Sequence, residues 1–257
     1  MTADQLEPRF RAALDSTPAP PGVDAGADLP ARLARASRDV LGVAGASVSL
    51  LTDEPLRRLP LASSDPQAAF AEQLQFTTGE GPCLTAHRIG QPGFSDVPDM
   101  ERRWPAFAEL LLTRTRYRAT ASLPLREGGR RFGALDLYLH TEQELRGLDV
   151  FDTVVVAALV ADHLTLAAGP EARRLTGPAS PWFEDAAPSA RLLVWQAVGM
   201  VAAIDSMDTE GALDRLRAYS WAHDRTTDEV SADLVARRLD PSAVLAADGP
   251  VPEDPIS

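Results

Sequence analysis

The chain of 257 residues contains no lysine, so all 25 of its basic residues are arginines. A phosphate-binding loop of the Walker type requires a lysine that contacts the nucleotide phosphates. Pyridoxal enzymes form their Schiff base on a lysine, and protein kinases place one on their third strand. The missing residue type therefore excludes all three of these enzyme classes.

Cysteine and histidine are also scarce. Cys83 is the single cysteine, which rules out an intrachain disulfide, and the lack of a basic neighbour nearer than His87 favours a buried structural thiol over a redox sensor. The other histidines, His140, His163 and His223, have no zinc-ligand spacing. With no G-x-S-x-G motif either, we expect no metal site and no enzyme activity, and the residues identify no cofactor.

Long apolar runs are absent too. The longest run, residues 153–161, ends at Asp162 and is far shorter than the roughly 20 residues of a membrane span. The first residues lack the apolar core of a signal peptide. The net charge of 25 − 37 = −12 disfavours a general affinity for nucleic acids or anionic membranes. We expect a cytoplasmic protein without a membrane partner.

Changes in composition divide the chain. Residues 1–28 begin with a short helical pattern and continue rich in proline, glycine and alanine, which predicts an N-terminal arm. Residues 169–188 contain four prolines and read as a linker. The segments in between and after are predicted to be two domains, at 29–168 and 189–240, followed by a tail at 241–257.

The first of these domains mixes strands and helices. Strands are predicted at 46–51, 56–64, 119–127 and 130–141, and helices at 30–42, 65–76, 102–114 and 148–168. Asp65 and Pro66 are suited to begin a helix, and Gly128 is suited to the turn of a hairpin. The pattern indicates an α+β fold, with helices packed on one antiparallel sheet.

The second domain is predicted to be all helical. Its first helix covers about 189–203, the second begins near Asp208, and Thr226 with Glu229 has capping-box spacing for the third. An interior glycine costs about 1 kcal/mol relative to alanine. We expect Ala197 and Gly199 to let the first helix approach the second closely.

This C-terminal domain resembles the ANTAR domain, a three-helix RNA-binding module of bacterial transcription antiterminators. The similarity rests on "QAVGM" at 196–200, "GALDRLRAYS" at 211–220 and "DRTTDEVSADLV" at 224–235. It implies binding to paired RNA hairpins in a transcript leader, usually as a homodimer. The residues expected at the RNA are Arg191, Arg217, Tyr219 and Arg225, the arginines for phosphate and Tyr219 for stacking.

Other readings of this domain stay open. Six arginines stand against nine acids between residues 189 and 240, a net charge of 6 − 9 = −3, whereas phosphate contacts dominate affinity for nucleic acids. Tyr219 could pack between helices and the arginines could be solvated. The alternative function is a protein-interaction or dimerisation module that has lost RNA affinity.

The middle domain is similar to the GAF domains that precede ANTAR domains in actinobacterial proteins, through residues 74–92, 102–111 and 130–138. This resemblance implies a six-stranded antiparallel sheet that senses a small molecule or dimerises. The aromatic residues expected to line a ligand pocket, or to fill the core instead, are Phe76, Trp104, Phe107, Tyr117 and Tyr138. Together the two resemblances predict a signal-responsive antitermination regulator, in which input shifts how two RNA-binding copies are presented.

Overall fold

The computed structural model describes residues 3–17, 28–52, 57–172 and 189–246. The contacts within the chain separate two compact units, Met1–Pro188 and Ser189–Ser257. Each unit is described by itself.

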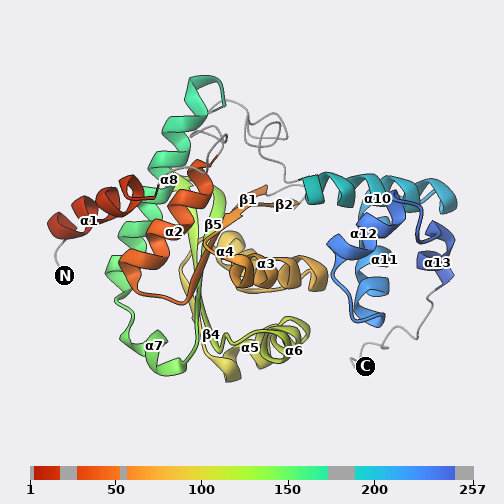
Figure 1. Ribbon diagram of the computed structural model, residues 1–257, viewed down its shortest axis with the longest axis horizontal. Coiled ribbons are helices and arrows are strands. Elements are labelled where there is room, and N and C mark those ends of the chain that lie inside the picture. Colours follow the sequence, from red (N-terminus) through yellow and green to blue (C-terminus); the bar gives the residue numbers. More distant parts are fainter. Residues whose placement is uncertain (1–2, 18–27, 53–56, 173–188, 247–257) are drawn as a thin grey trace. The chain divides into compact units, whose positions relative to one another are not determined.

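The first unit is built around one antiparallel sheet (Figure 1). Its strands are β1 (Gly45–Thr52), β2 (Arg57–Ser63), β3 (Gly93–Ser95), β4 (Ala119–Glu127) and β5 (Arg130–Leu139). They lie in the order β2-β1-β5-β4-β3, and every neighbouring pair is antiparallel. Among the described residues the sheet thus has five strands where the resemblance implied six, and β3, only three residues long, was not predicted.

Eight helices of the described residues surround this sheet. They are α1 (Ala3–Asp15), α2 (Leu29–Leu41), α3 (Pro66–Thr78), α4 (Pro82–Ile89), α5 (Val97–Arg103), α6 (Pro105–Arg114), α7 (Glu142–Gly147) and α8 (Val150–Ala172). Side chains of α1, α2 and α8 share a hydrophobic cluster with one face of the sheet, while α3, α4, α5 and α6 pack toward the other (Figure 1).

The two faces of the sheet differ in chemistry because side chains alternate along a strand. In β1, Ala46 and Val48 point into the apolar cluster beneath α2 and α8, and the alternate positions are Ser47 and Ser49. In β4 and β5 the apolar face is again aliphatic, whereas the alternate positions include Asp136. All of these residues are buried, so one face of the sheet carries polar groups into the interior.

Helix boundaries follow local capping chemistry. Asp65 caps α3 as predicted, because its carboxylate accepts the backbone N–H groups of Gln67 at 2.9 Å and Ala68 at 3.1 Å. The single helix expected at 102–114 was wrong: Trp104 has φ −143° and ψ 68°, which ends α5 and starts α6. Pro105 explains the break, since a residue before proline is disfavoured in the helical region.

The start of the predicted N-terminal arm is part of the fold. Leu6 and Phe10 of α1 are fully buried in the cluster formed with α2 and α8. Arg32 of α2 donates to the carbonyl oxygens of Leu14 at 2.8 Å and Thr17 at 2.7 Å, which ties the end of α1 in place. Residues 18–27 of the predicted arm lie outside the described residues.

Among the described residues one helix, α8, is long and apolar enough over Val150–Ala168 to cross a membrane by length and composition alone. Its inner side chains, Val156, Val160 and Leu164, are buried against the sheet, and a helix that covers a sheet needs such a face. Cytoplasmic location stays a prediction.

The second unit contains α10 (Ser189–Asp205), α11 (Thr209–Ala222), α12 (Thr227–Val235) and α13 (Pro241–Ala246). The caps lie where the sequence predicts them. Asp208 accepts the N–H of Gly211 at 2.8 Å, and Thr226 with Glu229 forms the complete capping box. Within the predicted tail, α13 packs on α10 and α11, which was not expected. Residues 173–188 of the predicted linker lie outside the described residues.

The expected role of Gly199 was wrong. Ala197 is fully buried on the inner side of α10, together with Val194 and Val201. Gly199 lies on the exposed side, and a Cβ atom added there would meet nothing within 4 Å. Close helix packing inside this unit therefore depends on Ala197. It does not explain why residue 199 is a glycine.

Candidate functional site

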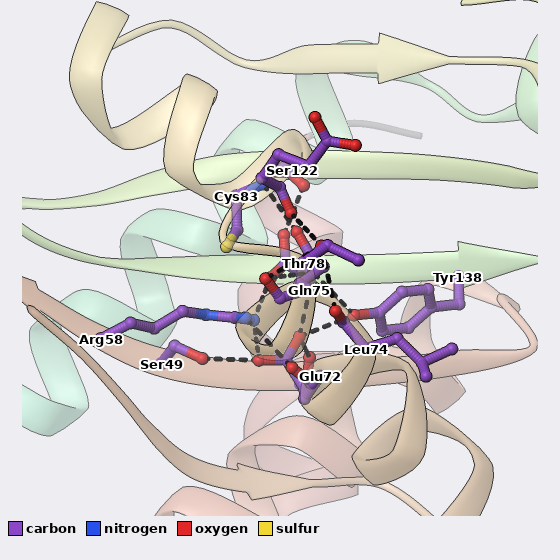
Figure 2. Close-up of polar contacts among 12 residues, drawn as sticks. Ser49, Arg58, Glu72, Leu74, Gln75, Thr78, Cys83, Ser122 and Tyr138 are labelled. Carbon is purple, nitrogen blue, oxygen red and sulfur yellow. Dashed lines mark hydrogen bonds and ion pairs between the residues drawn. The ribbon is translucent and has the colours of Figure 1, made fainter. Parts of the chain in front are cut away.

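The polar face of the sheet meets α3 and α4 in a buried polar cluster (Figure 2). Strands β1, β2, β4 and β5 each place at least one polar side chain there, and the two helices close the other side. None of these side chains is more than 4% exposed. The members of the cluster are Ser47, Ser49, Arg58, Glu72, Gln75, Cys83, Ser122, Asp136 and Tyr138.

The carboxylate of Glu72 in α3 is the centre of the cluster. Its Oε1 accepts hydrogen bonds from Ser47 Oγ and Tyr138 OH, both at 2.6 Å, and its Oε2 accepts one from Ser49 Oγ at 2.8 Å. Oε2 also forms an ion pair with the guanidinium of Arg58. Burial alone would raise the pKa of Glu72, but the Arg58 charge and these hydroxyl groups outweigh it and hold the pKa below its ordinary value.

Asp136 of β5 lies in the same cluster, but its pKa is shifted in the opposite direction. Burial, and next the charge of Glu72, raise its pKa well above the ordinary value, although Arg58 and a hydrogen bond from Ser122 act against the rise. The side-chain nitrogen of Arg58 is 3.6 Å from Asp136 Oδ2, farther than from Glu72. Because one cation faces two carboxyl groups and lies nearer to Glu72, we assign the negative charge that balances Arg58 to Glu72 and the proton to Asp136.

Gln75 connects the cluster to the start of α4. Its Nε2 donates to Tyr138 OH at 3.1 Å, and its Oε1 accepts the backbone N–H of Cys83 at 3.2 Å. Gly81 has φ +147°, and a Cβ atom at this residue would overlap Gln75. Only glycine suits this turn, which leads into α4.

Cys83 is fully buried, as expected of a structural thiol. Burial raises the pKa of this thiol, and the nearby carboxyl groups of Asp136 and Glu72 raise it further against the opposing effect of Arg58. Among the described residues, Arg58 Nε is buried without a hydrogen-bond partner. The cluster therefore holds a neutral thiol and a cation whose donors are not all used.

The aromatic residues predicted for a pocket mostly come together. Trp104, Phe107, Tyr117 and Tyr138 share one buried cluster with side chains of α3 and α6, and Phe76 is buried outside that cluster. The rings of Tyr117 and Tyr138 stack with their centroids 4.9 Å apart. None of these side chains is more than 6% exposed, so they fill the space between sheet and helices. Their role in ligand binding stays a prediction.

Sequence reasoning missed the charged members of the polar cluster. Arg58 and Asp136 lie within predicted strands, and Glu72 lies within a predicted helix. A charged residue on the buried side of an amphipathic element is rarely left without a partner, and this was the available signal. Tyr138 alone of the predicted pocket residues belongs to both the aromatic and the polar cluster.

The arginines predicted to bind RNA are paired with carboxylates where the structure describes them. Arg217 lies 3.3 Å from Asp214 Oδ1, and Arg225 lies 2.6 Å from Asp233 Oδ2. The side chain of Arg191 lies outside the described residues. An RNA phosphate would therefore have to displace an acidic partner from Arg217 and Arg225.

Tyr219 is 9% exposed and stacks on His223, with 3.9 Å between the ring centroids. Its ring is thus largely covered by the second unit itself. This geometry agrees with packing of Tyr219 between helices, and stacking of its ring on RNA stays a prediction.

No curated protein matches this chain. Solved structures with similarity to it include the GAF domain of an Acinetobacter phosphoenolpyruvate-protein phosphotransferase, with 14% identity over 65% of this chain and 96% of that chain, and a TM-score of 0.43. Free methionine-R-sulfoxide reductase from Neisseria meningitidis is 13% identical over 64% and 91% of the two chains, with a TM-score of 0.43. The GAF domain of a two-component sensor histidine kinase from Bacillus halodurans is 12% identical over 65% and 93%, with a TM-score of 0.34.

The family comparison covers most of the first unit. The family model described as "GAF domain" matches residues 28–166 and ends before the second unit. This range contains the whole sheet and both buried clusters. Because the match spans more than half of the 257 residues, this chain belongs to the GAF domain family.

Proposed function

We propose that this chain is a signal-responsive regulator, in which the first unit senses a small molecule and the second unit delivers the output. The observation that carries the proposal is Arg58, a buried cation whose Nε has no partner among the described residues. Ligand sites typically combine an apolar lining with a few convergent polar groups. Here the aromatic and polar clusters adjoin at Tyr138.

The chemistry of the cluster suggests the class of ligand. Replacing a buried ion pair by apolar residues is often neutral or stabilising, so stability alone gives little reason to keep Arg58 and Glu72 inside. A guanidinium binds carboxylate and phosphate groups through paired hydrogen bonds. A small molecule with such a group would compete with Glu72 for Arg58, and would favour whichever conformation of α3 and α4 admits it.

The sensing proposal predicts that the full chain, freshly purified from cells, retains a small molecule in native mass spectrometry. The added mass should be absent in Arg58→Lys, which keeps a charge but loses the guanidinium. Arg146→Lys is the matched control, because Arg146 forms an exposed ion pair with Glu142, and this variant should retain the molecule. If nothing is retained, and no carboxylate or phosphate metabolite raises the melting temperature, the sensing role at Arg58 is wrong.

For the output we propose hairpin RNA, as the ANTAR resemblance implies. The pairing of Arg217 does not prevent this, because Asp214 is 68% exposed and exposed ion pairs contribute only about 0–1 kcal/mol. A phosphate can replace such a carboxylate at low cost. Arg225 is paired as well, with Asp233, which also binds Arg238. We propose Arg217 for a phosphate contact and test it first.

Titration of a labelled two-hairpin RNA at several salt concentrations tests this output. We expect affinity to fall with salt, and Arg217→Ala to weaken binding and reduce the magnitude of the log–log salt slope by about 1. Arg146→Ala in the first unit should change neither quantity. Absence of binding even at low salt would favour the alternative, a protein-interaction or dimerisation module.

A further inference from the structure

Positive charge is concentrated at the C-terminal end of α4. Two segments meet there, residues 86–90 and 126–131, and together they contain four arginines and one acid. The arginines are Arg88, Arg126, Arg130 and Arg131. The acid, Glu127, pairs with Arg130 at 3.4 Å. In a chain whose net charge is −12, this excess of positive charge gives one end of the sheet a surface suited to an anion.

Two of these guanidinium groups converge on Gly90, the C-cap of α4. Arg126 of β4 donates to the carbonyl oxygen of Gly90, and Arg131 of β5 donates to that of Arg88 at 2.7 Å. A Cβ atom added to Gly90 would lie 2.7 Å from Arg126 Nη2 and 3.0 Å from Arg131 Nη1, so these two nitrogens lie close to one point. Gly90 also has φ +75°, and glycine therefore suits both the backbone and the space there.

The two arginines also face each other across the sheet. Arg126 and Arg131 are partners in the register of β4 and β5, beside the irregularity that follows Leu125. Like charges directly opposite each other in a sheet are destabilising. The carbonyl groups at the end of a helix carry only about half of an elementary negative charge, so they balance a part of the two positive charges. A bound dianion would balance the rest.

The donors for such an anion are accessible. Arg88 and Arg126 are exposed, and Arg131 is half-buried. A guanidinium group has five N–H donors, and Arg126 uses one of them for Gly90. Guanidinium groups bind phosphate through paired hydrogen bonds. A phosphate group offers enough oxygens to be bound by two guanidinium groups at once, and its double charge matches the pair.

We propose that the C-terminal end of α4 binds the phosphate group of a small soluble molecule through Arg126 and Arg131, with Arg88 adding positive charge nearby. This site is separate from the one at Arg58. Cys83, a member of the polar cluster, lies in the first turn of α4, and Ile89 lies in its last turn. The six positions between them span about 9 Å of helix. The two sites therefore lie at opposite ends of α4.

The melting temperature of the full chain, measured against phosphate concentration at constant ionic strength, tests this site. Phosphate at about ten times its dissociation constant should raise the melting temperature of wild type by about 3–6 °C relative to chloride. Phosphate also stabilises proteins as an excluded salt, but that effect does not depend on one arginine. In Arg126→Gln the dissociation constant should be about 10-fold higher. Arg131→Gln tests the same site independently.

Arg102→Gln and Arg58→Lys are the controls, and both should keep the full response to phosphate. Arg102 forms an exposed ion pair with Asp99, so Arg102→Gln removes one positive charge from another part of the same unit. The proposal is wrong if Arg126→Gln and Arg131→Gln respond to phosphate as wild type does, or if Arg102→Gln loses as much of the response. Loss of the response in Arg58→Lys, but not in Arg126→Gln, would place the phosphate in the buried cluster. That result would support the sensing site and overturn this one.

A lipid headgroup presents the same phosphate chemistry as a soluble molecule. Sedimentation with phosphatidylcholine vesicles that contain phosphatidic acid distinguishes the two sources. For a soluble ligand, both wild type and Arg126→Gln should stay in the supernatant. Co-sedimentation of wild type that Arg126→Gln abolishes would overturn the assignment to a soluble molecule.

Discussion

Replacement of Glu72 by glutamine should lower the free energy of unfolding by about 3–5 kcal/mol at neutral pH, because it leaves the buried Arg58 cation without its counter-charge. The amide also cannot accept hydrogen bonds from Ser47, Ser49 and Tyr138 as the carboxylate does. Urea denaturation of both proteins, followed by circular dichroism, measures the difference. A change below about 1 kcal/mol would contradict the assignment of the negative charge to Glu72.

Asp136→Asn is the matched control in the same cluster. Asp136 is assigned as protonated, so an amide of similar shape replaces a neutral group without the free-energy cost of protonating it, and Asp136→Asn should be at least as stable as wild type at neutral pH. Because the folded-state pKa of Asp136 is raised, its contribution is present at low pH and is lost as the pH rises through that pKa. The Asp136→Asn variant should not show this loss as the pH rises above the ordinary aspartate pKa. If Asp136→Asn is as destabilising as Glu72→Gln, both carboxyl groups are ionised.

The shifted pKa of Glu72 makes stability depend on pH in the opposite direction. Its folded-state pKa is lowered, so its stabilisation is present above the ordinary glutamate pKa and is lost as the pH falls through the folded value. The wild-type chain should therefore lose stability in strong acid more steeply than Glu72→Gln does. Comparison of Glu72→Gln with Asp136→Asn therefore distinguishes the contributions of these two carboxyl groups to the pH dependence of stability.

Replacement of Phe107 by alanine should cost about 3–5 kcal/mol, because this fully buried ring fills the space among α3, α6 and the sheet. Its backbone N–H, which donates to Glu80 Oε1 at 3.0 Å, is unaffected by the change. The loss comes from removed contacts and from the cavity that the rigid surroundings leave. Thermal and urea denaturation give the magnitude.

Phe151→Ala is the control for this variant. It removes the same ring from α8, where the side chain is 56% exposed. Its effect on the free energy of unfolding should stay below about 1 kcal/mol. Equal destabilisation by the two variants would show that Phe107 is not the core residue described above.

Much of the fold could be predicted because its signals are local. Asp65 with Pro66, and Thr226 with Glu229, begin helices through contacts within three residues. The alternation in β1 and β5 determines which face of each strand is apolar. The break at Trp104 was missed, although its cause, Pro105, is visible in the sequence.

The residues of the candidate site were harder to predict. The pocket residues were chosen as aromatics, and four of the five do share one cluster. Gly199 was chosen for packing, yet the stripe that packs inside the second unit is offset from it and contains Val194, Ala197 and Val201. The helical spacing of apolar residues indicates that a helix has a buried face. A shift of one residue in assigning that face rotates it by about 100° around the helix axis.

The local content of the sequence was enough to predict the four longer strands, the helix caps and the apolar face of the sheet, because these depend on residue type and on neighbours a few positions away. Only the tertiary structure decided that Glu72 meets Tyr138, 66 positions later, and that Arg58 lies beside both carboxyl groups of the cluster. Burial and neighbouring charge set protonation, and both arise only when distant segments pack together. The ion pairs of Arg217 and Arg225 are local by contrast, since Asp214 and Asp233 lie three and eight positions away in the chain.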